Sequence, residues 1–208
     1  MRPLLSLVIA LFLASGCQRR QDPKEIPPEP EFKPRTFEWE HVHVRLDEES
    51  VKKAGDWFGV IEPVKSCAKI YDSFEDYEES LRRFSRAQRL FAAIDWYLME
   101  VNNGGHDQFY SNSTGIVWKD ALDGLQLIGA NEVADILAES AKRMGGNPSF
   151  DRTVRQQQLE RHNADFRDLD DRLFNTESKL DAKMLGYIRA NPREFVFDGM
   201  VKRLKRED

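Results

Sequence analysis

The spacing of apolar side chains constrains the fold of this chain more than any other feature. They recur every three or four residues in several separate stretches, which places them on one face of an α-helix. The strongest stripe predicts a helix that carries Leu90, Phe91, Ile94, Leu98 and Val101. Weaker stripes predict further helices around Tyr77, Leu125, Ile136, Leu169 and Met184.

Capping residues indicate where these helices begin and end. Ser73 and Asn131 are predicted N-caps, and Ser85 with Gln88 three residues later fits a capping box. Asparagine and glycine accept the left-handed backbone of a helix C-cap. They are predicted to end helices at Asn102-Asn103-Gly104-Gly105, at Gly129 and at Gly145-Gly146.

The two ends of the domain are less regular. Residues 37–46 alternate apolar and polar side chains, which favours one short strand or an extended arm. The basic tail, residues 202–206, is interpreted as a helix end that could also touch anionic lipid. We therefore predict an all-α fold, an irregular bundle of about six to eight short helices with at most one short N-terminal strand.

The N-terminus predicts export and lipidation. Residues 3–13 form an apolar run that is too short to cross a bilayer but suits a secretory signal. Ala14-Ser15-Gly16 precede Cys17, and small residues before a cysteine are what a lipoprotein signal peptidase accepts. We predict a signal peptide over residues 1–16 and an acylated Cys17 that binds the membrane. A plain secretory signal cut nearby is the alternative.

Residues 17–36 follow as a lipidated cysteine and a proline-rich tether, and the helical domain is assigned to residues 37–208. Five of the nine prolines lie in residues 18–36, which favours an extended chain that could reach roughly 60 Å. Gln18 follows the cysteine directly, and an aspartate at this position would favour retention in the inner membrane. A glutamine there resembles the sorting signal of an outer-membrane lipoprotein. The predicted location is the bacterial cell envelope, and the outer rather than the inner membrane in a Gram-negative cell.

Charge and cysteine content narrow the classes of partner. The 31 basic and 36 acidic side chains give a net charge of −5, without the basic footprint of a nucleic-acid-binding protein.

Cys67 is the second of two cysteines, so an acylated Cys17 leaves it without a partner in its own chain. It is interpreted as a buried small hydrophobe, with an intermolecular disulfide as the alternative.

The segment Glu100–Gly115 (EVNNGGHDQFYSNSTG), hereafter the signature segment, resembles a family pattern. The family is the all-helical bacterial DNA-mimic-protein family, whose pattern is E-V-N-N-G-G-x-x-Q-[FY]-[FY]-x-N-S-[ST]-G. Later elements of the pattern match at Ala121-Leu122, at Ile128-Gly129-Ala130 and at Leu169-Asp170 with Leu173-Phe174. The resemblance covers about residues 60–190.

The resemblance implies a helical fold more strongly than an activity, because most members have no assigned function. The named member presents an acidic surface shaped like duplex DNA and sequesters a helix-turn-helix transcription factor in the cytoplasm. A lipid-anchored protein would not meet such a regulator. The modest net charge is also weak against a duplex, which carries one charge per about 1.7 Å. DNA mimicry is therefore the weaker hypothesis.

The signature segment allows two interpretations. In the structural one, its glycines turn the chain, its amides and hydroxyls satisfy backbone groups at helix ends, and its aromatic pair anchors it in the core. In the functional one, its side chains line a pocket or a recognition surface. Both concern the same residues: Asn102, Asn103, Gly104, Gly105, Gln108, Phe109, Tyr110, Asn112, Ser113 and Gly115.

Few residues are candidates for catalysis or metal binding. His106 and Asp107 are the best acid–base candidates, because they lie in the signature segment. His41 and His43 would share a strand face, but without a nearby third ligand they predict no metal site, and no cofactor is expected. The acidic run over residues 72–79, followed by four arginines, is interpreted as a solvated face with Glu78–Arg82 and Glu79–Arg83 pairs, or as a protein-binding patch.

The leading hypothesis is a lipid-anchored helical domain without enzymatic activity that binds another protein. The competing hypothesis is an envelope enzyme that uses His106 and Asp107. The third hypothesis, DNA mimicry, requires a cytoplasmic protein with an unmodified Cys17.

Overall fold

The computed structural model describes residues 38–176 and 179–205. The predicted signal peptide, Cys17 and the predicted tether lie outside these described residues. Among the helices that are described, none is long and apolar enough to cross a membrane.

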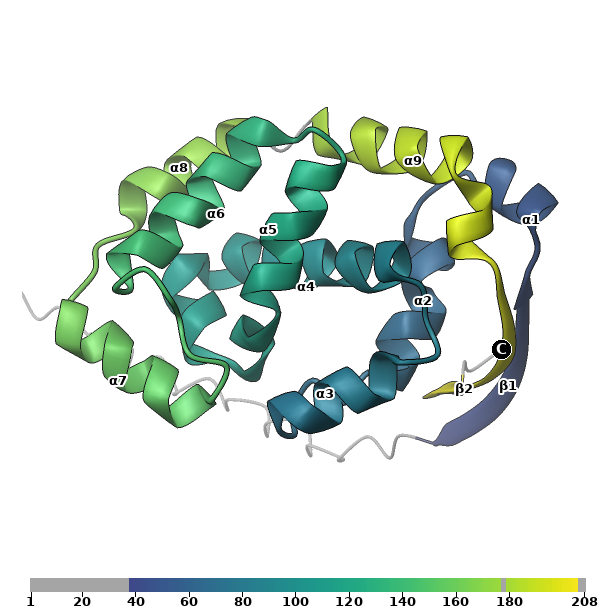
Figure 1. Ribbon diagram of the computed structural model, residues 1–208, viewed down its shortest axis with the longest axis horizontal. Helices are drawn as coiled ribbons and strands as arrows, with labels where there is room; N and C mark the ends of the chain where they lie inside the picture. The colour runs from purple at the N-terminus through teal and green to yellow at the C-terminus, as the bar shows by residue number, and fades with distance from the viewer. Residues whose placement is uncertain (1–37, 177–178, 206–208) are drawn as a thin grey trace, which may run out of the picture. The chain divides into compact units, whose positions relative to one another are not determined.

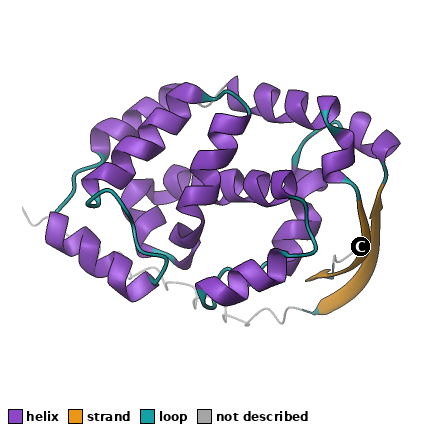
Figure 2. Ribbon diagram, in the orientation of Figure 1, coloured by secondary structure: helices purple, strands orange, loops and turns teal. Residues whose placement is uncertain are grey.

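The described residues form nine α-helices, two 3-10 helices and two strands (Figures 1 and 2). In chain order they are β1 (Trp39–Leu46), α1 (Glu48–Lys52), α2 (Phe58–Cys67), α3 (Phe74–Leu81), α4 (Arg86–Ser111), η1 (Ser113–Val117), α5 (Trp118–Leu127), α6 (Asn131–Arg143), α7 (Arg152–His162), α8 (Arg167–Thr176), α9 (Leu180–Ala190), η3 (Pro192–Phe195) and β2 (Phe197–Leu204). The all-α prediction with an N-terminal strand is confirmed.

The central element is α4, against which α2, α5, α7 and α8 pack (Figure 1). It begins at the predicted capping box, in which the Ser85 hydroxyl accepts from the Gln88 backbone and the Gln88 side chain accepts from the Ser85 backbone. Phe91, Ile94 and Tyr97 are fully buried on it. A helix covered on most of its surface in this way forms the core around which the shorter helices are arranged.

The predicted helix boundaries are correct at most positions. Ser73 caps α3 through the backbone N–H of Asp76, and Gly129 ends α5 with a φ of +67°. Asn131 is not a cap: Ala130 takes that place without a side-chain hydrogen bond, and Asn131 is the first residue of α6. The helix begins one residue early because the Ala130 carbonyl already accepts from the Ala134 backbone.

The C-terminal tail is a strand, which corrects the predicted helix end. β2 pairs antiparallel with β1, from Trp39 opposite Leu204 to Leu46 opposite Phe197. Its side chains alternate, so that Phe197 and Val201 are buried beside exposed neighbours. The partner strand comes from the opposite end of the domain, so no short stretch of sequence could reveal the pairing.

Cys67 is half-buried at the end of α2, with its side chain against the core, rather than fully buried as predicted. Burial raises the pKa of its thiol, which leaves it protonated and weakly nucleophilic at neutral pH.

Candidate functional site

The signature segment is helical over most of its length, and not the loop that the sequence suggested. It forms the end of α4 and the start of η1. The predicted helix stop at Gly104-Gly105 is a kink, where the backbone leaves helical geometry and returns to it. Gly105 has a φ of +74°, a conformation that glycine adopts without strain.

Glu100 is the hub of the signature segment. It is 8% exposed, and its carboxylate accepts hydrogen bonds from Gln108 Nε2 at 2.7 Å, Asn112 Nδ2 at 2.9 Å and Thr114 Oγ1 at 2.7 Å. Burial raises the pKa of Glu100, but the three hydrogen bonds outweigh this effect and hold the pKa below its ordinary value. The amides of the segment therefore bind its own carboxylate across the kink.

The kink also brings α8 against α4. A Cβ on Gly105 would stand 2.5 Å from Asp170 Oδ2, so only glycine leaves room for that carboxylate. Asp170 Oδ1 in turn accepts from the backbone N–H of His106 at 3.0 Å and contacts His106 Nδ1 at 2.5 Å. The far ring nitrogen, Nε2, lies 2.9 Å from the Tyr97 hydroxyl.

His106 is fully buried in this network, so it has no contact with solvent. Asp107, the other acid–base candidate, is exposed. Burial, followed by the charges of Asp170 and Asp165, raises the pKa of Asp107. The two candidates therefore do not converge on one accessible point, and His106 serves to join α4 to α8.

A buried arginine closes the other end of the segment. Arg155 of α7 is fully buried, and burial lowers the pKa of its guanidinium to about 10. The group donates to backbone carbonyls, those of Tyr110, Asn112, Ser149 and Phe150. A Cβ on Gly115 would lie 2.5 Å from Arg155 Nε, which explains the glycine at that position.

Phe109 and Tyr110 are fully buried between these two ends. The phenol of Tyr110 shares a 2.8 Å hydrogen bond with Ser140 of α6, and burial raises its pKa. The segment thus contacts α6, α7 and α8 at once. Tyr97 completes it from the preceding turn of α4, and Arg155, Asp170 and Ser140 complete it from distant positions. Of these residues only Asp170 lay in a stretch that the resemblance had marked.

Two of the predicted site residues face outward instead. Asn102 and Asn103 are exposed on α4, directly before the kink. Asn102 lines a groove of about 500 Å³ whose apolar rim includes Phe58 and Met99, each about half exposed. An ion pair between Lys65 and Asp95 also lines the groove.

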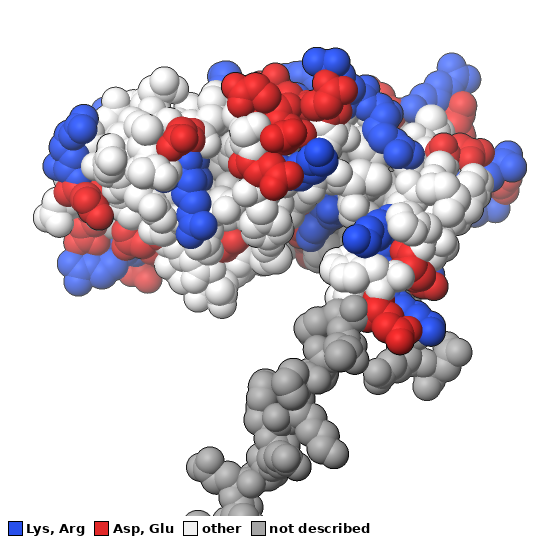
Figure 3. All heavy atoms as spheres, turned by 90° about the horizontal axis from the view of Figure 1, so that it is seen from below, with Lys and Arg blue, Asp and Glu red and all other residues white. Residues whose placement is uncertain are grey.

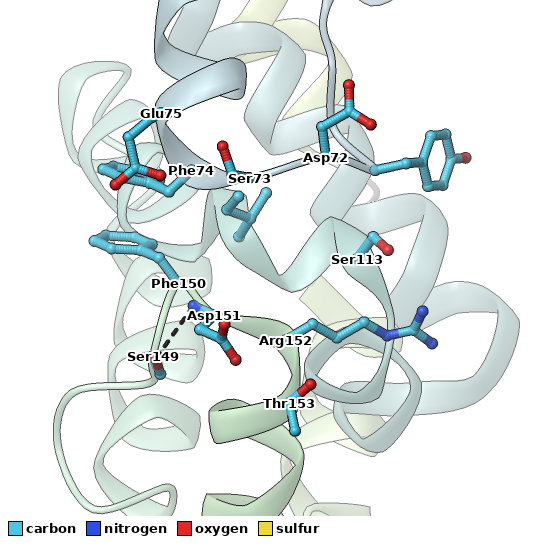
Figure 4. Close-up of a pocket in the computed structure, with 12 residues that line it drawn as sticks. Asp72, Ser73, Phe74, Glu75, Ser113, Ser149, Phe150, Asp151, Arg152 and Thr153 are labelled. Carbon is cyan, nitrogen blue, oxygen red and sulfur yellow. Dashed lines mark hydrogen bonds between the residues drawn. The ribbon is translucent and has the colours of Figure 1, made fainter.

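Ser113, at the other end of the signature segment, borders a cavity of about 540 Å³, hereafter the α3–α7 cavity. Figure 4 shows it between the start of α3 and the start of α7, with the Phe74 and Phe150 rings stacked at one side. Their centroids are 4.0 Å apart. It is lined by Tyr71, Asp72, Ser73, Phe74, Glu75, Ser113, Ile116, Ser149, Phe150, Asp151, Arg152 and Thr153.

Two of the acidic side chains that line the α3–α7 cavity are unpaired. Tyr71 is 80% exposed beside it. Within the described residues, the carboxylates of Asp72 and Glu75 make no hydrogen bond or ion pair, whereas Asp151 caps α7 through the Val154 N–H. Arg152 is the basic residue of the lining, and its Nε donates to the Ser111 carbonyl. The two free carboxylates therefore lie in a lining that also holds one arginine and an aromatic wall.

The rest of the predicted acidic run is paired, although not as predicted. Glu78 pairs with Arg89 at 2.9 Å, and Glu79 pairs with Arg82. Arg83 lies over the Phe197 ring instead, with its guanidinium carbon 4.9 Å from the centroid. Figure 3 shows acidic and basic side chains interspersed on the face that it draws.

The strand histidines do share a face, since His41 and His43 are both exposed on β1. His43 Nε2 lies 2.9 Å from Asp198 Oδ1. Across the described parts of the chain, no group of three or more His, Cys, Asp or Glu side chains is placed to hold a metal ion.

Comparison with known proteins gives one match. The family model described as DMP19-like protein matches residues 82–191, which is more than half of the chain and contains the whole signature segment. No curated protein and no solved structure matches the chain.

Proposed function

Since the chain belongs to the DMP19-like protein family, we propose that it is a protein-binding module rather than an enzyme. The proposal places it in the bacterial envelope, anchored through an acylated Cys17, with a binding surface at the α3–α7 cavity. The observation that carries it is the free acidic rim of that cavity, beside a segment whose own polar groups are already bound.

In this proposal the signature segment holds the residues around the α3–α7 cavity in place and does not itself contact the partner protein. Gln108, Asn112 and Thr114 donate to the Glu100 carboxylate, so this carboxylate and the three donor atoms are already bound. Because His106 is fully buried, it supports no surface chemistry either. A rigid scaffold that carries a free polar rim is the usual arrangement of a binding site.

The cavity suits a protein that presents a basic segment. Asp72 and Glu75 each offer a carboxylate to a lysine or arginine, and the stem of a side chain bound at Glu75 could lie against the neighbouring Phe74 and Phe150 rings. Tyr71 is mostly exposed, and tyrosine is one of the residues that dominate the energy of protein interfaces. The partner class is thus a protein with exposed lysine or arginine next to an apolar side chain.

The N-terminal sequence supports the proposed anchor. The apolar run ends in small residues at Cys17, which fits processing by a lipoprotein signal peptidase. Acyl chains contribute about 0.8 kcal/mol per buried CH₂, so several chains on one cysteine give stable anchoring. The proline-rich residues that follow would form an extended segment, and its length would set the greatest distance between the domain and the lipid surface.

Photo-crosslinking in intact envelopes tests the binding role. A photoreactive amino acid at Tyr71 is expected to give a discrete adduct with one partner protein. The same probe at Phe174, an exposed position on α8, is the matched control and should not give that adduct. No adduct at Tyr71, or the same adducts at both positions, would contradict the proposal.

Charge reversal separates specific binding from chance contact. The double variant Asp72→Lys with Glu75→Lys is expected to lose the adduct, because it removes the negative rim. Glu160→Lys with Asp171→Lys changes the net charge by the same amount at exposed positions on α7 and α8. If both double variants lose the adduct equally, net charge and not the cavity governs binding.

DNA mimicry is the second candidate, and the family match favours it. It predicts that a DNA-binding protein captures this chain and that duplex DNA competes for the same surface. The paired acids of α3 and the interspersed charges in Figure 3 weigh against a continuous phosphate-like array. Failure of duplex DNA to displace the partner would remove this candidate.

A further inference from the structure

The outer face of the β1–β2 sheet is a second exposed surface, distinct from the α3–α7 cavity. Side chains alternate along both strands, so every second cross-strand pair faces outward. Four pairs make up this outer face: Trp39 with Leu204, His41 with Lys202, His43 with Met200, and Arg45 with Asp198. Figure 2 shows the two strands at one side of the helices.

The inner face of the same sheet is covered. Phe197 and Val201 are buried on it, and β2 packs against α2. The outer face carries large apolar side chains that stay exposed: Trp39 at 57%, Met200 at 49% and Leu204 at 43%. The outer face therefore combines exposed apolar side chains with polar and charged ones.

The charges on the outer face are mainly basic. Lys202 Nζ lies over the Trp39 ring, 5.1 Å from its centroid, so a cation and an aromatic ring are presented together. Arg45 is largely exposed. Asp198 is the one acid among the four pairs, and it lies 2.9 Å from His43 Nε2 and 4.0 Å from Arg45 Nε. This basic face belongs to a chain whose net charge is −5.

We propose that the outer face of the β1–β2 sheet rests on a lipid surface that contains anionic headgroups. The inference rests on the proposed anchor, because β1 is the first described element after the predicted acylated cysteine and tether. Tryptophan favours the boundary between headgroups and acyl chains, since its ring is apolar and its N–H is polar. Lysine and arginine beside it bind anionic headgroups.

Binding of the full-length Cys17→Ser protein to vesicles tests this face without acylation. The vesicles contain phosphatidylglycerol and phosphatidylcholine in equal parts, and phosphatidylcholine alone is the comparison. The chain has four tryptophans, all of them described, and Trp57, Trp96 and Trp118 are at most 6% exposed. Quenching by acrylamide therefore reports mainly on Trp39.

We expect the anionic vesicles to protect Trp39 from acrylamide, and the neutral vesicles to protect it less. Lys202→Glu is expected to weaken co-sedimentation with anionic vesicles by roughly fivefold or more. Trp39→Phe should remove the change in quenching while leaving the fold intact. Phe174→Ser with Arg161→Glu is the matched control, because it removes one exposed apolar and one exposed basic side chain elsewhere.

The apolar run at residues 3–13 is present in every variant, so binding of Lys202→Glu is compared with that of the matched control and is not interpreted alone. Equal loss of binding in Lys202→Glu and in the control, or unchanged quenching of Trp39, would overturn the inference. An acylated native protein with an unprotected Trp39 would contradict lipid binding by the outer face and leave the proposed anchor intact. An unacylated native protein whose Trp39 is protected would support lipid binding by the outer face and contradict the proposed anchor.

Discussion

Asp170 Oδ1 lies 2.5 Å from Nδ1 of His106 and also accepts from the backbone N–H of that residue at 3.0 Å. One carboxylate oxygen from α8 thereby fixes both the ring and the backbone of a fully buried histidine on α4. The contact lies immediately after the kink at Gly105, so the kink and the interhelical contact depend on each other.

Replacement of His106 tests the structural role of that contact. His106→Ala should lower the free energy of unfolding by about 2–4 kcal/mol, because it leaves a cavity and removes the buried partner of Asp170. Asp107→Ala, at the exposed neighbour, should change it by less than about 0.5 kcal/mol. Urea unfolding followed by circular dichroism measures both. Equal, small effects would show that the network is not stabilising.

Replacement of Gly115 tests how closely Arg155 packs against the signature segment. A Cβ there would meet Arg155 Nε at 2.5 Å and the backbone oxygen of Phe109 at 2.6 Å. Gly115→Ala should therefore cost about 1–3 kcal/mol of stability. Gly186→Ala, in α9 and with no atom within 4 Å of the new Cβ, should stabilise by up to about 1 kcal/mol. A tolerated Gly115→Ala would contradict the close packing of Arg155.

Glu100 predicts a particular dependence of stability on pH. Its pKa in the folded protein is below the ordinary value of 4.5, so its contribution is present above that value and is lost as the pH falls through the folded pKa. Glu100→Gln should be less stable than the wild type by about 1–3 kcal/mol at pH 7.

The difference between Glu100→Gln and the wild type should shrink as the pH falls, because the wild-type carboxyl then also becomes neutral. Thermal unfolding of both proteins across the acid range measures this. A difference that stays constant with pH would show that Glu100 does not bind its three donors as a carboxylate.

Local patterns in the sequence predicted the helices because helix formation depends on neighbours in the chain. The Ser85–Gln88 capping box and the glycine at position 129 are contacts within a few residues, and the structure contains them. The kink at Gly105 was interpreted as an end for the same local reason. Nothing within a few residues shows that the helix resumes after it.

The support of the signature segment could not be predicted, because it is built from distant residues. Arg155 lies 45 residues from Tyr110, whose carbonyl it binds, and Asp170 lies 64 residues from His106. The strand β2 was missed for a similar reason, since its partner β1 begins near residue 39. Contacts of this range follow from tertiary packing and leave no periodic pattern in the chain.

The most direct test of the proposed envelope role is the intact mass and membrane fractionation of the native protein beside Cys17→Ser. We expect the native protein to lack residues 1–16, to carry acyl chains on Cys17 and to fractionate with membranes, and the variant to be released. A native protein that keeps its first sixteen residues, carries no acyl chain and stays out of the membrane fraction would contradict the account. DNA mimicry would then become the leading hypothesis.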